Sequence, residues 1–180
     1  MNEEEAKKAL KDVLKFTDND LNRLEIFRIL LLEYNIKYNL ISKSTENSIW
    51  ARHILDSAQL LKYFSISAGG VLADLGTGAG FPGVVLDIFN KNPEFHVKLF
   101  EKSPIKRDFL NTIKKKINIR AEIIENVYQD EIAAEIIVCR AFKKLDKIIK
   151  ISRETVKKPH KILILKGKNA QAEINNVSLP

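Results

Sequence analysis

The chain has 180 residues, of which 45% are hydrophobic and 29% are charged, as in one ordinary soluble globular domain with room for a helical appendage. The single cysteine, Cys139, excludes an internal disulfide and favours a reducing, cytoplasmic compartment. The chain begins with acidic residues and contains no apolar run near the ~20 residues of a spanning helix, so we expect neither a secretory signal nor a membrane partner. Its three histidines lie far apart in sequence, so no metal site is expected.

Positive charge is concentrated in the middle and at the end of the chain, and the formal net charge is +7. Residues 1 to 60 carry nine Lys and Arg against ten Asp and Glu. Residues 98 to 120 carry eight against two, and residues 140 to 168 carry eleven against two. Lysines on solvated helix faces would account for either cluster alone. Two clusters that frame one ligand site favour a polyanionic partner.

Residues 1–68 are predicted to form an N-terminal helical segment. A helix is expected near residues 4–14. A second begins at a capping box, Thr17-x-x-Asp20, and continues with apolar residues at helical spacing. After a break near residues 39–44, a further amphipathic run extends from Ile49 to Leu61. Gly69-Gly70 then separates this segment from a predicted α/β domain, residues 69–180.

In the α/β domain, short apolar runs alternate with helical patterns. A helix is predicted after Pro82-Gly83. Another starts at Ser103-Pro104, with the Ser103 hydroxyl as its cap, and a third covers residues 143–157. Strands alternating with helices predict a mostly parallel, doubly wound sheet. The predicted strands are 71–75, 96–100, 121–125, 135–139 and 161–165.

A glycine-rich turn follows the first predicted strand, in the run Asp74-Leu75-Gly76-Thr77-Gly78-Ala79-Gly80-Phe81-Pro82-Gly83. Such a turn lies at the carboxyl end of a parallel sheet, where ligands bind. The dinucleotide fingerprint needs a third glycine where Phe81 stands, which disfavours a nicotinamide dehydrogenase. Gly-x-Gly-x-Gly with an acid two residues upstream resembles the first motif of class I S-adenosylmethionine methyltransferases.

Further motifs, taken in chain order, resemble one family, called RsmG or GidB. They are Asn39-Leu40, Arg52-His53-Ile54-Leu55-Asp56-Ser57, the glycine turn with Phe81-Pro82-Gly83, Lys106-Arg107 with Phe109-Leu110, Cys139-Arg140-Ala141-Phe142 and Leu165-Lys166-Gly167. The resemblance implies a Rossmann-like class I methyltransferase fold. It also implies transfer of a methyl group from S-adenosyl-L-methionine to N7 of a guanine in small-subunit (16S) ribosomal RNA.

The cofactor-binding residues are predicted from the glycine motif, from the ends of the strands and from the family resemblance. An acid at the end of the second strand, Glu101, is placed to accept hydrogen bonds from ribose hydroxyls. The resemblance puts Val127 and Tyr128 beside the adenine and Arg140 at the closing edge of the site. The predicted cofactor-binding residues are Asp74, Gly76, Gly78, Phe81, Glu101, Val127, Tyr128 and Arg140. The competing interpretations are core packing for Phe81 and Val127, a solvated strand-end acid for Glu101 and a surface cation for Arg140.

No general base is nominated, because guanine N7 has a lone pair and no proton to remove. Catalysis by positioning needs neither a triad nor a metal. Cations near strand ends are expected to contact RNA phosphates, and the predicted RNA-binding residues are Arg52, Lys102, Lys106, Arg107, Lys143 and Lys144. His53 and Asp56 could either contact the substrate or form a buried hydrogen bond with each other.

Two other functions fit the sequence: methyl transfer to another substrate, and a truncated cofactor- or RNA-binding module with little catalysis. The second arises because the chain stops at Pro180, whereas family members usually continue through two more strands. Residues 175–180 are too short and polar for a hairpin, so strand 161–165 is expected at an exposed sheet edge. A monomer is expected. The uncovered edge should either lower its stability or lead to dimerisation through β-strand pairing at that edge.

Overall fold

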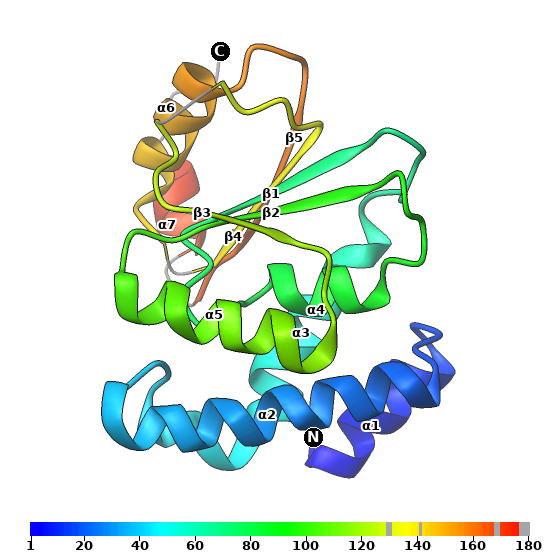
Figure 1. Ribbon diagram of the computed structural model, residues 1–180. Coiled ribbons are helices and arrows are strands. Elements are labelled where there is room, and N and C mark those ends of the chain that lie inside the picture. Colours follow the sequence, from blue (N-terminus) through cyan, green and yellow to red (C-terminus); the bar gives the residue numbers. More distant parts are fainter. Residues whose placement is uncertain (129–130, 141, 168–169, 177–180) are drawn as a thin grey trace.

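A parallel five-stranded sheet forms the centre of the protein, as the sequence predicted (Figure 1). The computed structural model describes residues 1–128, 131–140, 142–167 and 170–176. Its strand order is β3-β2-β1-β4-β5, so the chain runs outward from β1 in one direction, returns, and continues through β4 to β5. The strands are β1 (Val71–Leu75), β2 (His96–Phe100), β3 (Glu122–Ile124), β4 (Ile136–Arg140) and β5 (Lys161–Leu165).

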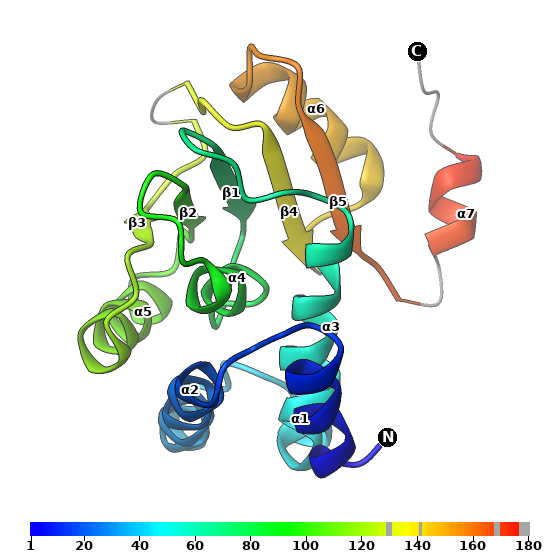
Figure 2. The same ribbon diagram turned by 90° about the vertical axis from the view of Figure 1, so that its right-hand side faces the viewer.

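Alternate residues of the central strands enter two different hydrophobic clusters. In β1, Leu72 belongs to the cluster shared with the N-terminal helices, whereas Ala73 and Leu75 belong to the cluster shared with Ile148 and Ile151. This period of two is what a strand buried on both faces requires. Helices α4 (Gly83–Phe89) and α5 (Pro104–Ile117) cover the first face, and α6 (Leu145–Thr155) covers the second (Figure 2).

The N-terminal segment is helical, as predicted, and packs beneath α4 and α5 (Figures 1 and 2). It contains α1 (Glu3–Asp12) and α2 (Asp18–Tyr38), and α2 begins with the predicted Thr17 and Asp20 capping box. The amphipathic run after the break is less regular than a single helix. It consists of 3-10 turns at Lys43–Ser48 and Gln59–Lys62, a π-helical turn at Trp50–Leu55 and the short α3 (Asp56–Ala58).

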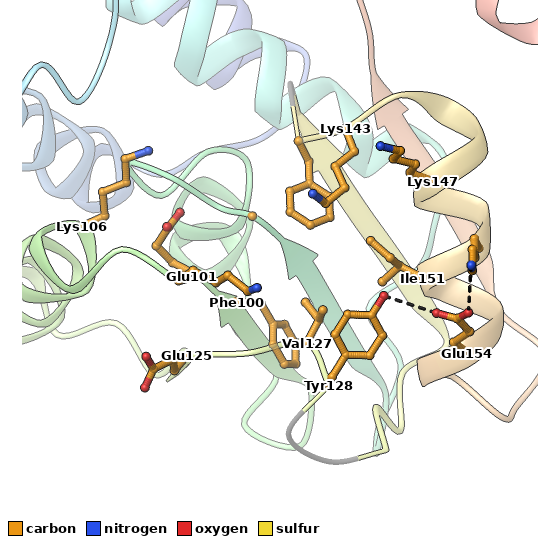
Figure 3. A pocket seen from close by; sticks show the side chains of 14 residues that line it. Phe100, Glu101, Lys106, Glu125, Val127, Tyr128, Lys143, Lys147, Ile151 and Glu154 are labelled. Atoms are coloured by element: carbon orange, nitrogen blue, oxygen red, sulfur yellow. Dashed lines mark hydrogen bonds and ion pairs between the residues drawn. The ribbon is translucent and has the colours of Figure 1, made fainter.

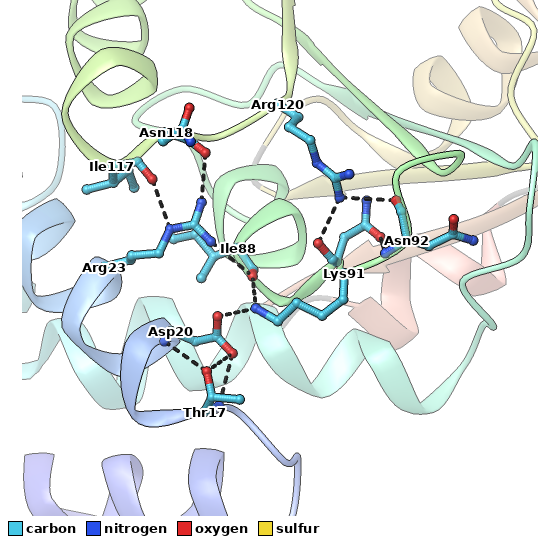
Figure 4. Close-up of polar contacts among 10 residues, drawn as sticks. Thr17, Asp20, Arg23, Ile88, Lys91, Asn92, Ile117, Asn118 and Arg120 are labelled. Carbon is cyan, nitrogen blue, oxygen red and sulfur yellow. Dashed lines mark hydrogen bonds and ion pairs between the residues drawn. The ribbon is translucent and has the colours of Figure 1, made fainter.

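Arg23 of α2 fastens the helical segment to the α/β domain (Figure 4). Its guanidinium donates to the carbonyl oxygens of Ile117 at 2.9 Å and Asn118 at 3.1 Å, at the end of α5. Buried Asp20 binds Lys91, just beyond α4. Carbonyls at a helix end lack partners within the helix, so a cation there satisfies them and complements the helix dipole. The helical segment is therefore held in one place against the sheet layer.

Several predicted details differ in the structure. Ser103 precedes α5 in extended conformation, but its hydroxyl makes no capping bond. Instead its amide donates to the Glu101 carboxylate at 2.8 Å. The third strand is shorter than predicted, and the last long helix covers 145–155 rather than 143–157. Within the described residues β5 pairs only with β4, so it lies at the predicted edge. The predictions that involve Ala141, Lys168 and residues 177–180 lie outside the described residues.

Candidate functional site

The glycine turn connects β1 to α4 and lies at the carboxyl end of the sheet. Gly76, Gly78 and Gly80 have φ angles of +70°, +61° and +100°, a region that side chains disfavour. The amides of Gly76 and Thr77 donate to the Phe100 carbonyl at 2.9 and 3.0 Å, which ties the turn to the end of β2. A Cβ atom at Gly76 would lie 2.1 Å from the Phe142 ring, so this position has no room for a side chain.

Asp74 lies beneath the glycine turn and is fully buried. Its Oδ2 accepts a 2.7 Å hydrogen bond from the Gly83 amide at the start of α4, while Oδ1 has no hydrogen-bond partner. Burial raises the pKa of this carboxyl to about 7. The sequence predicted a cofactor ligand here, and the contacts that the structure gives Asp74 are with the end of the turn.

The raised pKa of Asp74 predicts a pH-dependent stability. In the unfolded chain the carboxyl loses its proton near its ordinary pKa, about 3.8, and in the folded protein near pH 7. The folded state therefore binds more protons between these values, and the free energy of unfolding falls as the pH rises from about 4 to 7. Each unit of pKa difference corresponds to about 1.4 kcal/mol.

We expect Asp74→Asn to remove this dependence, because an amide keeps the acceptor for Gly83 and never ionises. Denaturant unfolding at pH 5 and pH 8 measures it. Asp74→Ala should be less stable than the asparagine variant at both values, since it leaves the buried Gly83 amide without an acceptor, at a cost of roughly 1–3 kcal/mol. An asparagine variant with the same pH dependence as the original protein would contradict the assignment.

The carboxylate of Glu101 joins the glycine turn to the next helix. Its Oε2 accepts from the Gly78 amide at 2.9 Å and its Oε1 accepts from the Ser103 amide at 2.8 Å. The residue is 9% exposed and forms part of a cavity wall. Both oxygens retain acceptor capacity after these bonds, because an ionised carboxylate has about four lone-pair sites. A ligand with hydroxyl groups would find acceptors here.

This cavity, which we call the α6 cavity, has a volume of about 560 Å³ and lies between the ends of β1 to β3 and helix α6 (Figure 3). Phe100, Val127 and Ile151 form its apolar part, and lysines surround it. Tyr128 is 54% exposed, and its hydroxyl donates to Glu154 at 3.3 Å across the cavity. The lining residues are Gly76, Phe100, Glu101, Lys102, Lys106, Glu125, Val127, Tyr128, Phe142, Lys143, Lys147, Lys150, Ile151 and Glu154.

A second cavity of about 790 Å³, which we call the Arg140 cavity, lies where β4 and β5 end beside the irregular helical run. The Arg140 guanidinium donates to the Arg52 carbonyl at 3.0 Å and contacts Nδ1 of His53. It also lies over the Phe81 ring, 5.3 Å from the centroid. The lining residues are Met1, Thr45, Ser48, Ala51, Arg52, His53, Leu55, Asp56, Gln59, Arg140, Leu165, Lys166 and Gly167.

His53 is neutral in this arrangement. Burial, together with the cations of Arg140 and Arg52, lowers the pKa of His53 to about 4. Since a guanidinium can only donate, Nδ1 is the acceptor, and the remaining proton on Nε2 points to Thr45 Oγ1, 2.9 Å away. The predicted alternative of a His53–Asp56 hydrogen bond is therefore wrong, because Arg140 and Thr45 use both ring nitrogens.

The predicted cofactor residues separate into three groups in space. Gly76, Glu101, Val127 and Tyr128 line the α6 cavity. Asp74, Gly78 and Phe81 line neither cavity, and Phe81 is 3% exposed, packed against Phe27 and His53 at 5.0 Å between ring centroids. Arg140 lines the second cavity, on the other side of the β4 end. Core packing thus accounts for the contacts of Phe81.

The predicted RNA-binding cations also differ in their surroundings. Lys102, Lys106 and Lys143 line the α6 cavity, and Arg52 lines the Arg140 cavity. Arg107 is occupied within the protein, because it donates to the carbonyls of Glu101 and Lys102 and pairs with Glu125 at 3.3 Å. Lys144 precedes α6 and lines neither cavity.

Sequence reasoning missed two cations, Lys147 and Lys150, which line the α6 cavity. Their signal was available, since they alternate with buried Ile148 and Ile151 at helical spacing. Among the described residues no three His, Cys, Asp or Glu side chains gather as a metal site would require. No helix in the same part of the chain is long and apolar enough to cross a membrane.

The strand order, the glycine turn after β1 and the acid that follows β2 define a fold like that of class I S-adenosylmethionine methyltransferases. The solved structure of precorrin-6y C5,15-methyltransferase from Geobacter metallireducens has a TM-score of 0.55 to this chain. The match covers 77% of this chain and 71% of that one, at 15% sequence identity. Identity this low supports likeness of fold alone.

The family itself is established by sequence. The family model "GidB: rRNA small subunit methyltransferase G" matches residues 20–178. Ribosomal RNA small subunit methyltransferase G of Rickettsia felis is 39% identical over 155 residues, covering 86% of this chain and 78% of the relative. Its Bartonella quintana counterpart is 34% identical over 181 residues, covering 97% and 83%. The chain belongs to the rRNA small subunit methyltransferase G family, whose methyl donor is S-adenosylmethionine.

Proposed function

We propose that this protein transfers a methyl group from S-adenosylmethionine to N7 of a guanine in small-subunit ribosomal RNA. The observation that carries the proposal is the family match over residues 20–178, combined with the cavity that the glycine turn and Glu101 form at the end of the sheet. We further propose that it acts in the cytoplasm, where ribosomal subunits are found, and as a monomer.

The α6 cavity fits the cofactor by the chemistry of its lining. Phe100, Val127 and Ile151 offer an apolar slot for an adenine ring, and the Glu101 carboxylate offers acceptors for ribose hydroxyls. Gly78 lines neither cavity, but its amide donates to Glu101 Oε2 at 2.9 Å and so holds that carboxylate at the cavity wall. Tyr128 and Gly76 complete the walls. Asp74 stabilises the glycine turn of this site by accepting a hydrogen bond from the Gly83 amide.

When bound, the cofactor supplies an electrophilic methyl group on a sulfonium sulfur. Guanine N7 has a lone pair and no proton, so the chain needs no general base. The task of its residues is to orient the base and exclude water, which can contribute several kcal/mol. Arg140 lines the Arg140 cavity and lies over the ring of buried Phe81, so its guanidinium can fix the approach of a substrate there.

Phosphate binding is proposed for the cations around both cavities. Lys102, Lys106, Lys143, Lys147 and Lys150 line the α6 cavity, and Arg52 lines the Arg140 cavity. Lys166 also lines the Arg140 cavity, but it is paired with Glu173 and donates to the Lys143 carbonyl. Contacts of this kind position RNA without reading its sequence. Arg107 is expected to contribute less than these, since carbonyls and Glu125 already take its donors.

The function is tested by incubating the protein with methyl-labelled S-adenosylmethionine and small ribosomal subunits from cells that lack this gene. We expect label in the small-subunit RNA and its recovery as 7-methylguanosine after nuclease digestion. Free small-subunit RNA and large-subunit RNA serve as parallel substrates. Label in another base, in protein or in large-subunit RNA would favour a different methyltransferase activity. Cofactor binding without transfer to any of these substrates would favour a binding module.

A further inference from the structure

The Arg140 cavity contains a carboxylate, Asp56, whose hydrogen-bonding capacity is mostly unused. Its Oδ1 accepts from Gln59 Nε2 at 2.7 Å, and its Oδ2 lies 4.0 Å from Arg140 Nη1, beyond hydrogen-bond distance. Its side chain is 41% exposed and faces the cavity. Arg140 does not depend on this carboxylate, because two of its five N–H groups already donate to the Arg52 carbonyl and to His53. Asp56 is thus a hydrogen-bond acceptor at the cavity wall, and it does not hold Arg140 in position.

The Arg140 cavity is adjacent to the glycine turn. β1 and β4 are neighbouring strands paired as far as Asp74 and Val138, and the chain continues two residues beyond these to Gly76 and to Arg140. Arg140 also lies over the ring of Phe81, a residue of the glycine turn. Neighbouring strands are about 4.8 Å apart. Gly76 lines the α6 cavity and Arg140 lines the second one. A base in the Arg140 cavity would therefore lie next to the end of the α6 cavity that Gly76 forms.

We propose that Asp56 binds the Watson–Crick edge of the target guanine and thereby turns N7 toward the glycine turn. This inference rests on the proposed function. Guanine presents N1–H and the 2-amino group side by side, and a carboxylate accepts both at once. N7 lies on the opposite side of the purine from these donors. Adenine has an acceptor at N1 and no 2-amino group, so the same carboxylate discriminates against it.

The neighbours of Asp56 fit the remaining atom of that edge. Guanine O6 is an acceptor beside N1–H, and it needs a donor next to the carboxylate. Arg140 and Gln59 line the cavity beside Asp56, and each has N–H groups beyond those already bonded, whereas Lys166 is bound by Glu173 and the Lys143 carbonyl. A carboxylate flanked by donors matches the acceptor–donor–donor order of guanine. A cavity of about 790 Å³ is large enough for a purine nucleotide.

Asp56 would also favour the reaction and not only the binding of the base. Methylation at N7 makes the purine cationic, and the charge strengthens N1–H and the 2-amino group as donors. Their hydrogen bonds to a carboxylate are therefore stronger in the transition state than in the bound guanine. Because the benefit grows as the methyl group is transferred, removing the charge should lower kcat more than it raises KM.

The test combines Asp56→Asn with an RNA in which the methylated guanine, once located, is replaced by inosine. Inosine retains N1–H and lacks the 2-amino group. For the original protein we expect inosine to lower kcat/KM by roughly tenfold, and Asp56→Asn to lower kcat on guanine by roughly 10- to 100-fold. In the variant, inosine and guanine should react at nearly equal rates, since the shared contact is already lost.

Asp12→Asn, an exposed carboxylate at the end of α1, is the matched control and should leave all rates unchanged. Cofactor affinity by calorimetry should be the same in all three proteins. The proposal is overturned if the original protein methylates inosine as fast as guanine, a measurement that needs no variant. It is also overturned if Asp56→Asn keeps full kcat, or if the inosine penalty persists in it undiminished. An original protein that methylates no guanine in small-subunit RNA would overturn the proposed function, and this inference with it.

Discussion

Replacing Gly76 with alanine is expected to abolish cofactor binding. The new Cβ would lie 2.1 Å from the Phe142 ring, and alanine disfavours the φ angle of +70° at this position. Either Phe142 moves into the α6 cavity or the turn changes its path, and both disturb the wall that Gly76 forms. We expect affinity for S-adenosylmethionine, measured by calorimetry, to fall by roughly 100-fold or more, about 2.7 kcal/mol.

Gly69→Ala is the matched control for this substitution. Gly69 has a φ angle of +72°, nearly the same as that of Gly76, but a Cβ there would meet nothing within 4 Å. It precedes β1 and lines neither cavity. Both variants therefore introduce similar backbone strain, but only Gly76→Ala places a Cβ atom against the Phe142 ring. Equal loss of affinity in the two would attribute the effect to strain, and unchanged affinity in Gly76→Ala would refute the cofactor site.

Replacing Arg140 with alanine is expected to lower methyl transfer by roughly 100-fold, through loss of its charge-assisted hydrogen bonds at the junction of the two cavities. The Arg52 carbonyl and Nδ1 of His53 lose their donor, and Phe81 loses the cation over its ring. The guanidinium lies in the Arg140 cavity, so cofactor affinity should change far less than the rate. Single-turnover assays and calorimetry on the same preparations separate the two effects.

A readout beyond activity comes from His53. Its pKa is lowered first by burial and then by the Arg140 cation, so the Arg140→Ala variant should have a His53 pKa above about 4 and still below 6.5. Because His53 binds a proton less readily in the folded state, the free energy of unfolding falls as the pH drops from about 6.5 to about 4. This fall should be smaller in the Arg140→Ala variant. Imidazole NMR titration measures the pKa.

Arg153→Ala, an exposed arginine on α6, is the control for loss of positive charge. It should leave both the rate and the His53 titration unchanged. Cofactor affinity that collapses along with the rate in Arg140→Ala would instead support the role that the sequence predicted, in which Arg140 closes the cofactor site. Full activity in that variant would support a surface cation without function.

The sequence alone was sufficient for the strand and helix order. Apolar runs of about five residues between helical patterns identified the five strands, and three of them, 71–75, 96–100 and 161–165, have the bounds that were predicted. These features depend on local periodicity and on the residues at segment ends, such as the Thr17 and Asp20 capping box. The glycine turn was equally readable, because its positive φ angles require residues that are visible in the sequence.

The sequence could not say which predicted residues share a cavity. Arg140 and Phe142 are two residues apart, yet they line different cavities. Asp56 and Arg140 are far apart in sequence and line the same one. Motif order lists the residues near a strand end, but which side of the sheet each one faces depends on how the chain packs there. Ser103 is similar: its sequence fits a hydroxyl cap, and Glu101 takes its amide instead.

What the sequence by itself determined was therefore the class of fold, the family and the position of the glycine turn, since each follows from short motifs whose own residues are close together in the chain. Only the tertiary structure decided that Phe81 is core, that Arg107 is occupied and that His53 pairs with Arg140 rather than Asp56. The reason is physical. A side chain such as Arg107 or His53 has a few hydrogen-bonding atoms, and their partners come from segments that only the fold brings together: Glu125 after β3 for Arg107, and Arg140 at the end of β4 for His53.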